Sequence, residues 1–233
     1  MSYAGQAIQA APFFPRSATA VPDNELGGPA ELETAGTVCD FSKGETIFNE
    51  GDLVDASYKV VRGVVRLCRL SSDGRRQIAG FRLPGDLIGI ESNGEYDMTA
   101  EAVRDVVAVR YSKARLDRLS HEKPGVRDHL LSHLCRDLRS AQEHLITLGC
   151  QSAVERVASF LLQLARRAGV ADGGVIDMQL GRQDIADYLG LTLETVSRTF
   201  TELTNRDLIA TPKRRHVQIK NRARLKAAAI PLH

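Results

Sequence analysis

The side chains best suited to chemistry in this 233-residue chain cluster near residue 195. Glu194, Ser197 and Arg198 bring a carboxylate, a hydroxyl and a guanidinium within five residues. On a helix, Glu194 and Arg198 share one face, because side chains four residues apart are neighbours. In the major groove of DNA, an arginine can pair with O6 and N7 of guanine, and a glutamate can accept from N4 of cytosine. The alternative is a solvent-exposed salt bridge, which contributes only about 0.3–0.5 kcal/mol to a helix.

The surrounding residues predict two short helices joined by a glycine turn. Residues 183–189 form the first helix, Gly190 turns the chain, and Thr192 caps a second helix that runs to about Asn205. The expected inward-facing positions are Ile185, Ala186 and Leu189 on the first helix and Leu193, Val196, Phe200 and Leu203 on the second. Such a pair is a helix-turn-helix, whose second helix enters the major groove by its N-terminal end.

A basic hairpin is expected to follow these helices. Residues 208–210 and 217–219 predict two short strands, and the turn between them contains Lys213, Arg214 and Arg215. Cationic side chains here would contact phosphates and set affinity rather than sequence preference, although an ordinary charged hairpin tip is the alternative. The predicted contacts to the DNA backbone are Thr192, Thr195, Arg182, Lys213, Arg214 and Arg215.

Positive charge is concentrated in the same half of the chain. Residues 151–233 carry 13 Lys and Arg against 8 Asp and Glu, whereas residues 1–150 carry 18 against 21. A mildly basic segment suits a polyanionic partner. No apolar run reaches the roughly 18 residues of a membrane span, and no secretory signal is evident, so we expect no membrane contact and a cytoplasmic location. No Ser/His/Asp, Cys/His or paired-carboxylate pattern predicts an enzyme.

A repeat of small and leucine side chains precedes the basic half. Its members are spaced 3, 4, 3, 4 and 3 residues apart, which is the a/d pattern of a coiled coil. This predicts a long helix that pairs in a homodimer; the alternative is a helix that packs on its own β domain. Gly149 interrupts the pattern, and Ser152 with Glu155 predicts a capping box that starts a new helix, so a hinge is expected near residue 150. The expected interface residues are Leu131, Leu134, Leu138, Ala141, Leu145 and Leu148.

Cysteines and histidines supply the remaining reactive groups. The four cysteines are Cys39, Cys68, Cys135 and Cys150. They contain no C-x-x-C pair and no zinc spacing, so neither a metal site nor a disulfide framework is expected. Cys135 beside the helix repeat and Cys150 at the hinge are candidate redox switches, with a small buried hydrophobe as the alternative for each. His129 and His133 lie one helical turn apart without an evident third ligand, which predicts a solvent-exposed helix face rather than a metal or haem site.

Residues 37–111 have the texture of a β domain. Short β-branched and apolar runs alternate with turn signals, which predicts an antiparallel barrel or jelly roll. The expected strands are residues 58–62, 64–70, 76–83, 98–103 and 106–111. The first 35 residues are rich in Pro, Ala and Gly and predict a loosely ordered arm, so ordered structure should begin near Thr37.

Three segments resemble the CRP/FNR superfamily of bacterial transcription regulators. They are Phe41–Asp52, Leu83–Gly89 and Asp184–Arg198, the last containing E-T-V-S-R. Within the superfamily the sequence is similar to the FNR/FixK side, which the run Asp73–Ile78 also resembles. The resemblance implies that Glu194, Ser197 and Arg198 read TTGAT-type half-sites in an inverted repeat.

The same resemblance implies a homodimeric regulator, expected to be an activator that recruits RNA polymerase through barrel loops such as residues 71–75. Its expected genes serve low-oxygen respiration, nitrogen fixation or denitrification. The implied fold is α+β: an arm (1–35), a β-roll of the cyclic-nucleotide-binding type (36–120), a dimerisation helix (121–149) and a winged helix-turn-helix (150–233).

Two departures from the superfamily limit the expected cofactors. Iron–sulfur members hold a 4Fe–4S cluster through closely spaced N-terminal cysteines, whereas residues 1–38 contain no cysteine, so no cluster is expected. Cyclic-AMP receptors carry an Arg-Ser pair after the turn that here spans Gly85–Gly89. Glu91 and Asp97 occupy this stretch instead and would repel a phosphate, so no cyclic nucleotide is expected.

Two other functions stay open at this point. A member of the same superfamily could be gated by haem, nitric oxide or another small molecule bound in the barrel or beside the long helix. From a different class, a β-roll also serves as a ligand-binding regulatory module of an enzyme or a channel. The helix-turn-helix pattern of residues 180–219 speaks against that last alternative.

Overall fold

The computed structural model describes residues 29–71, 74, 76–213 and 215–230. These residues form two compact units, residues 29–146 and 147–230, and each is described by itself. The predicted N-terminal arm is described only from Pro29 onward, and Arg214 lies outside the described residues.

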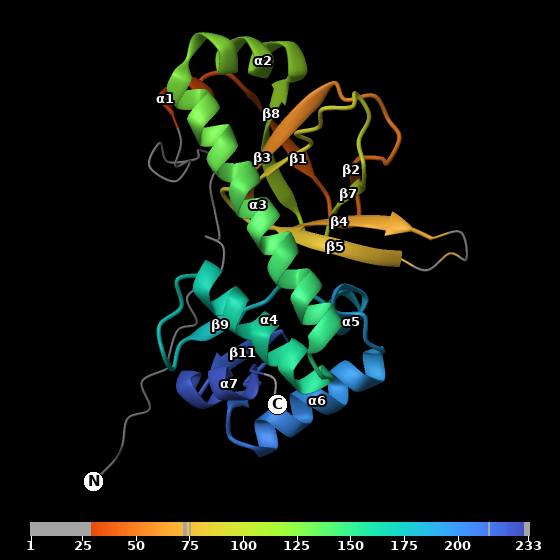
Figure 1. Cartoon of the computed structure of the whole chain (residues 1–233), viewed down its shortest axis with the longest axis vertical. Helices are drawn as coiled ribbons and strands as arrows, with labels where there is room; N and C mark the ends of the chain where they lie inside the picture. Colours follow the sequence, from red (N-terminus) through yellow and green to blue (C-terminus); the bar gives the residue numbers. More distant parts are fainter. Residues whose placement is uncertain (1–28, 72–73, 75, 214, 231–233) are drawn as a thin grey trace. The chain divides into compact units, whose positions relative to one another are not determined.

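The first unit is built on two antiparallel sheets (Figure 1). Their strands are β1 (Thr37–Phe41), β2 (Thr46–Phe48), β3 (Ala56–Arg62), β4 (Val65–Leu70), β5 (Arg76–Arg82), β6 (Leu87–Ile88), β7 (Thr99–Ala102) and β8 (Val106–Ser112). One sheet has the order β1-β8-β3-β6 and the other the order β2-β7-β4-β5. Val60 and Ala108 from the first sheet and Val65 and Ala100 from the second are fully buried in one cluster. The predicted β-roll is confirmed.

The apolar run of β8 has a simple cause, which is that both faces of the strand are covered. Val106 and Ala108 join the core between the sheets. Val109 and Tyr111 belong to a second cluster on the opposite face, together with Leu116. A strand buried on both faces reads as a continuous apolar run rather than an alternating one.

Helices form the outer side of this second cluster (Figure 1). They are α1 (Ala30–Glu33), α2 (Lys113–Glu122) and the start of α3 (Pro124–Cys150). Leu32 of α1 is only 1% exposed. The expectation that ordered structure begins near Thr37 is therefore wrong, because this one leucine anchors a helical turn upstream of the first strand.

The long helix α3 leaves its leucine repeat in water. Leu131 is 58% exposed, Leu138 61% and Leu145 69%, while Leu134 is 44% exposed. Ala141 is exposed as well, and Leu148 is half-buried. Side chains of this kind on consecutive turns form an apolar stripe that nothing in the described chain covers. The helix passes through Gly149 and ends at Cys150.

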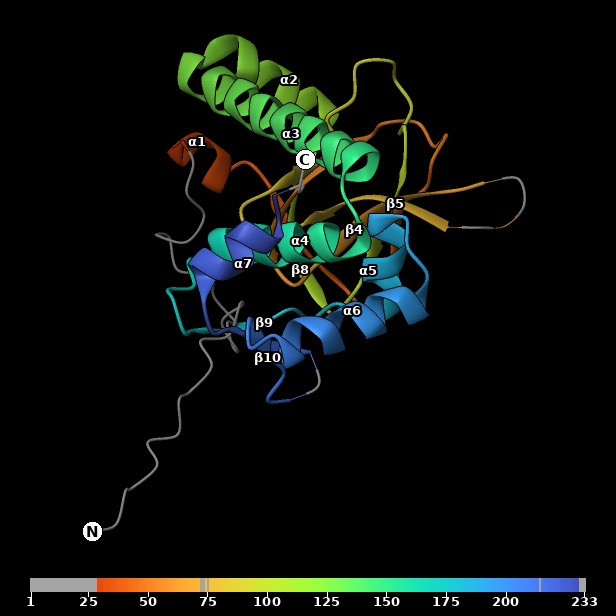
Figure 2. The same ribbon diagram turned by 60° about the horizontal axis from the view of Figure 1, so that its bottom comes forward.

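The second unit contains four helices and a small sheet (Figure 2). Its elements are α4 (Ala153–Arg167), β9 (Val175–Asp177), α5 (Arg182–Leu189), α6 (Leu193–Asn205), β10 (Ile209–Ala210), β11 (His216–Ile219) and α7 (Arg222–Ala228). The expected wing strands are present as β10 and β11, and the unexpected β9 pairs with β11 as a third strand. The expected capping box at the start of α4 is present, with Ser152 and Glu155 as its two members.

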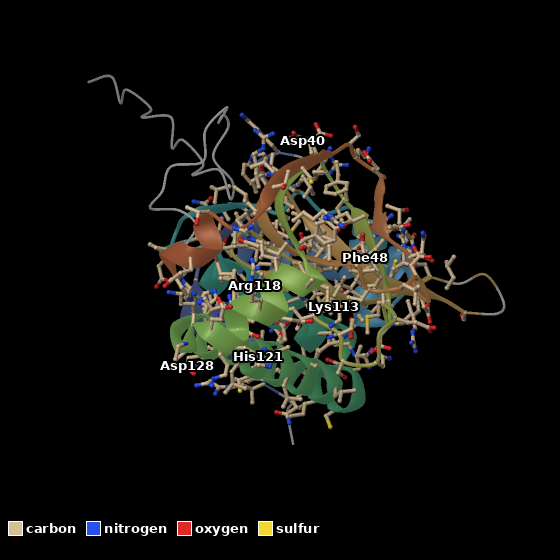
Figure 3. The ribbon with its side chains drawn as sticks, turned by 90° about the horizontal axis from the view of Figure 1, so that it is seen from above. Asp40, Phe48, Lys113, Arg118, His121 and Asp128 are labelled. Atoms are coloured by element: carbon tan, nitrogen blue, oxygen red, sulfur yellow. The ribbon has the colours of Figure 1, made fainter. Side chains whose placement is uncertain are left out.

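The prediction that the two histidines of α3 lie on a solvent-exposed face is wrong. His133 is only 7% exposed, and its ring lies 4.7 Å from that of His129, centroid to centroid. The side chain contributes to the wall of a cavity in the first unit, which a sequence pattern for one helix cannot show. Burial, together with the charge of Arg136, lowers the pKa of His133 to about 4. By contrast, Lys113, Arg118 and His121 of α2 and Asp128 of α3 lie on the solvent side in Figure 3.

We expect His133 to make the protein sensitive to mild acid. As the pH falls from 6.5 to about 4, His133 is protonated in the unfolded chain but stays neutral in the folded protein. The unfolded state is therefore favoured, and stability present above pH 6.5 is lost in this window. The loss amounts to at most about 1.4 kcal/mol for each pH unit. Urea unfolding at pH 6.5, 5.5 and 4.5 should show a shallower decline for His133→Gln than for the wild type.

His121→Gln, a change on the exposed face of α2, is the matched control and should keep the wild-type pH dependence. Equal pH slopes for His133→Gln and the wild type would contradict the assignment.

Candidate nucleic-acid interface

The turn between α5 and α6 has the geometry of a helix-turn-helix. α5 ends at Leu189, and Gly190 follows in the left-handed conformation, with φ of 61°. Glycine adopts this conformation without the steric cost that a β-carbon brings. Thr192 then caps α6, because its hydroxyl accepts from the backbone N–H of Thr195 at 3.1 Å. The glycine and the cap predicted from the sequence are both confirmed.

The buried face of α6 differs from the prediction at one residue. Val196, Phe200 and Leu203 are buried as expected, but Leu193 is 46% exposed. Thr199, which was not expected inside, is only 4% exposed. A rotation of about 100° per residue centres the buried face on Val196, Thr199 and Leu203 and leaves Leu193 at its edge.

The three candidate base-reading residues lie on the exposed side of α6. The side chains of Arg198 and Glu194 are 79% and 71% exposed, and they form an ion pair with 2.5 Å between Nη2 and Oε1. Ser197 is exposed and donates a hydrogen bond to the carbonyl of Leu193 at 2.9 Å. An exposed ion pair is worth at most about 1 kcal/mol, so it costs little to exchange it for contacts to a base.

The candidate phosphate-contacting residues lie in two different places, the N-terminus of α6 and the wing turn. Thr192 and Thr195 sit at the N-terminus of α6, with 2.8 Å between their hydroxyl oxygens. Lys213 is exposed in the wing turn, and Arg215 closes that turn with φ of 69°. Arg214 lies outside the described residues.

Arg182 has an unexpected position. Its guanidinium carbon lies 3.3 Å from the ring centroid of Phe200, and burial lowers its pKa to about 10. A guanidinium stacked on an aromatic face packs one helix on the next. Arg182 therefore joins α5 to α6. This role could not be predicted from the sequence alone, because it depends on how the two helices pack.

The cysteines fall into two groups. Cys68 is 2% exposed, and burial beside Glu101 raises its pKa to about 11, so its reactive thiolate form is disfavoured. Cys39 is half-buried, whereas Cys135 and Cys150 are exposed. Among the described residues, no group of three or more His, Cys, Asp or Glu side chains is arranged to hold a metal ion.

A cavity of about 200 Å³ lies within the first unit, between β-roll residues and α3. Its wall includes Glu91 and Asp97, the acidic residues that occupy the stretch where cyclic-AMP receptors carry an Arg-Ser pair. Burial and the neighbouring Asp97 raise the pKa of Glu91. Arg82 also lies in this wall, and its Nη2 lies 3.3 Å from a carboxylate oxygen of Asp137.

A β-roll, a long helix with an exposed apolar stripe and a winged helix-turn-helix together define a DNA-binding regulator with an effector-type domain. Family models match the first and last of these parts: a cyclic nucleotide-binding domain matches residues 38–123, and a Crp-like helix-turn-helix domain matches residues 155–228. The chain belongs to the CRP/FNR family of transcription regulators, and it is of the FNR/FixK type.

Individual relatives support this assignment over most of the chain. The nitrogen fixation regulation protein FixK of Bradyrhizobium diazoefficiens is 43% identical over 77% of this chain and 77% of its own length. FixK of Azorhizobium caulinodans is 41% identical over 90% of this chain and 86% of its own. The structure of FixK2 from Bradyrhizobium japonicum matches with a TM-score of 0.80 and 37% identity, covering 85% of this chain and 99% of that one.

Membership has direct consequences. The chain is a transcription regulator and not an enzyme, and its helix-turn-helix implies DNA binding and dimerisation. None of the helices in the described part of the chain is long and apolar enough to cross a membrane.

The cap of α6 provides a test of the local geometry. Thr192→Val removes the hydroxyl that accepts from Thr195 but keeps the shape of the side chain. We expect a loss of about 1 kcal/mol in unfolding free energy, the usual cost of deleting an N-cap, as measured by denaturant unfolding.

Thr201→Val is the matched control, because Thr201 is exposed on the same helix and caps nothing. A Thr192→Val variant no less stable than Thr201→Val would contradict the role of the cap.

Proposed function

We propose that this protein is a homodimeric transcription activator that reads palindromes of the TTGAT–ATCAA type. The observation that carries the proposal is the exposed trio Glu194, Ser197 and Arg198 at the N-terminal half of α6. A recognition helix contacts base edges with just this part, and an arginine and a glutamate have complementary partners in guanine and cytosine. The Crp-like helix-turn-helix model matches residues 155–228, the segment that contains the trio.

The phosphate contacts in this proposal come from the start of α6 and from the wing. Thr192 and Thr195 present hydroxyls and backbone N–H groups at a helix N-terminus, which favours an anion. Lys213, Arg214 and Arg215 add positive charge in the wing turn. Arg182 is set apart from this group, because its guanidinium already stacks on Phe200.

The dimer interface in this proposal is the exposed stripe of α3. It consists of Leu131, Leu134, Leu138, Ala141, Leu145 and Leu148. A two-fold axis between paired helices makes the two recognition helices equivalent and requires a palindromic site. The two half-sites then lie one turn of DNA apart, about 34 Å.

We also propose these domain boundaries: a β-roll at residues 36–120, a dimerisation helix at 121–149 and a DNA-binding domain at 150–233. Activation would proceed by contact with RNA polymerase in the cytoplasm, through β-roll loops such as residues 71–75. The names of the relatives suggest target genes for nitrogen fixation. Genes for low-oxygen respiration or denitrification are the further targets that the resemblance to the FNR/FixK side implies.

The cavity in the β-roll supports a second candidate, gating by a small molecule. Its volume of about 200 Å³ is below the roughly 300–1,000 Å³ of typical ligand pockets, so it suits a compact ligand rather than haem. Glu91 and Asp97 in its wall disfavour an anion. If tight binding to the palindrome requires an added compact ligand, this candidate replaces the ligand-free activator. Absorbance of the purified protein in the Soret region would instead show bound haem and a ligand site other than this cavity.

The experiment that tests the proposed function is fluorescence anisotropy of a TTGAT–ATCAA duplex with the ligand-free protein at fixed salt. A scrambled duplex is the control. Tight and selective binding supports the proposal, and equal binding to both duplexes contradicts it.

Arg198 should determine selectivity. We expect Arg198→Ala to lose about 1–3 kcal/mol of binding to the palindrome and to tolerate a changed base at one half-site position. Lys213→Ala is the contrast: it should weaken binding to all duplexes alike and reduce the slope of log K against log salt by about 1. Equal losses for Arg198→Ala on specific and scrambled DNA would refute base reading.

The leucine stripe should hold the dimer together. Leu138→Lys places a charge at its centre, so sedimentation equilibrium should show a shift to monomer and anisotropy a loss of palindrome binding. Leu70→Lys is the matched control, because Leu70 is 71% exposed at the end of β4 and lies off the stripe. A Leu138→Lys protein that remains dimeric would place the interface elsewhere.

A further inference from the structure

Arg156 makes an unusual set of hydrogen bonds in the second unit. Its Nε donates to the carbonyl of Gln151 at 2.8 Å, its Nη1 to that of Leu189 at 2.9 Å and its Nη2 to that of Leu148 at 2.8 Å. Each guanidinium nitrogen therefore serves a different backbone carbonyl. The fixed fork of a guanidinium can hold three acceptors at once, which a lysine ammonium on a flexible stem does less well.

These three carbonyls belong to elements that meet at the predicted hinge. Leu148 lies in the last turn of α3, Gln151 is in the link to α4, and Leu189 ends α5, the first helix of the helix-turn-helix. Leu148 would ordinarily receive a helical bond from Ser152, but that N–H donates to Glu155 within the capping box. The capping box thus leaves a helix-end carbonyl for Arg156.

Electrostatics explain why an arginine suits this place. The C-terminal ends of α3 and α5 carry partial negative charge, and a cation between them is favourable. The same arginine lies in the first turn of α4, where the positive end of a helix disfavours a cation. Arg156 therefore stabilises the two neighbouring helix ends and not its own helix.

Gly190, the residue of the helix-turn-helix turn, lies beside Arg156 and Leu148. A β-carbon at Gly190 would lie 3.6 Å from both Nη1 of Arg156 and Cδ2 of Leu148. The link itself is fastened on its other side, where Gln151 donates to the carbonyl of Ala229 and accepts from Ser159, each at 3.1 Å. Arg156 thus joins the last turn of α3 to the end of α5.

We propose that Arg156 is a positioning residue that sets the direction in which α3 leaves the helix-turn-helix. In a dimer held by paired α3 helices, this direction determines the separation of the two recognition helices. It therefore determines which spacing between half-sites the protein accepts. The inference rests on the proposed function, since it assumes a palindromic site.

The test compares palindromes whose spacer is unchanged, or shorter or longer by one or two base pairs. Each added base pair moves a half-site by about 3.4 Å and rotates it by roughly 35°. The wild type should favour one spacer. Arg156→Gln should reduce that preference by about tenfold, within the usual range of coupling between linked elements, while binding to a single half-site stays unchanged.

Two further variants separate positioning from folding. Arg156→Lys keeps the positive charge but loses the planar guanidinium, so it should show a spacer preference between those of the wild type and Arg156→Gln. This variant replaces Arg156→Gln in the test if Arg156→Gln does not fold. Arg167→Gln, at the exposed far end of α4, should behave as the wild type. If Arg156→Gln weakens binding to all spacers equally, or keeps the wild-type preference, the residue is merely structural and the inference fails.

A measurement without DNA keeps the inference distinct from the proposed function. Cys39, Cys135 and Cys150 are replaced by serine, and a spin label is attached through Thr201→Cys on the exposed side of α6. Pulsed dipolar spectroscopy should give a narrow distance distribution for the dimer and a broader one with Arg156→Gln. An unchanged distribution overturns the inference, whereas failure of the wild type to bind any palindrome overturns only the proposed function.

Discussion

The exposed leucine stripe of α3 is the constraint on which the rest of this structure depends. Fully burying one leucine side chain stabilises a protein by about 1.5–3 kcal/mol, and here leucines on consecutive turns remain in water. In the proposed dimer, a second copy of the same helix covers them with matching side chains at a two-fold axis. The palindromic form of the proposed operator follows from this symmetry, and no residue of the recognition helix has to encode it.

Local chemistry explains why the DNA-binding part was readable from the sequence. Gly190 and Thr192, and the pair Ser152 and Glu155, act within a few residues of themselves. Their structural roles can be predicted without knowledge of the fold, because a left-handed turn or a helix cap needs only nearby backbone groups. The β-roll was readable for a related reason, since its longer strands bury continuous or alternating apolar residues.

The features that the sequence did not predict depend instead on partners that are distant in the sequence. His133 is buried in the wall of a cavity shared with the β-roll, and Leu32 is buried in the same cluster as Leu116. Arg182 finds the ring of Phe200 on the next helix. Strands β6 and β9 have two and three residues and are defined by their pairing, which no periodicity of that length can reveal. Propensity and spacing predict an element, whereas burial depends on what packs against it.

The interface with DNA and the interior of the domain place different demands on neighbouring residues of α6. Val196 and Leu203 are fully buried, whereas Glu194 and Arg198 are more than two-thirds exposed and form an ion pair with each other. Their ion pair contributes little to folding, so these proposed base-reading positions can change without unfolding the helix. Operator preference can therefore diverge within this family while the fold stays the same. What must be kept is the geometry that presents the helix: the glycine turn, the cap and the arginine that joins the ends of α3 and α5.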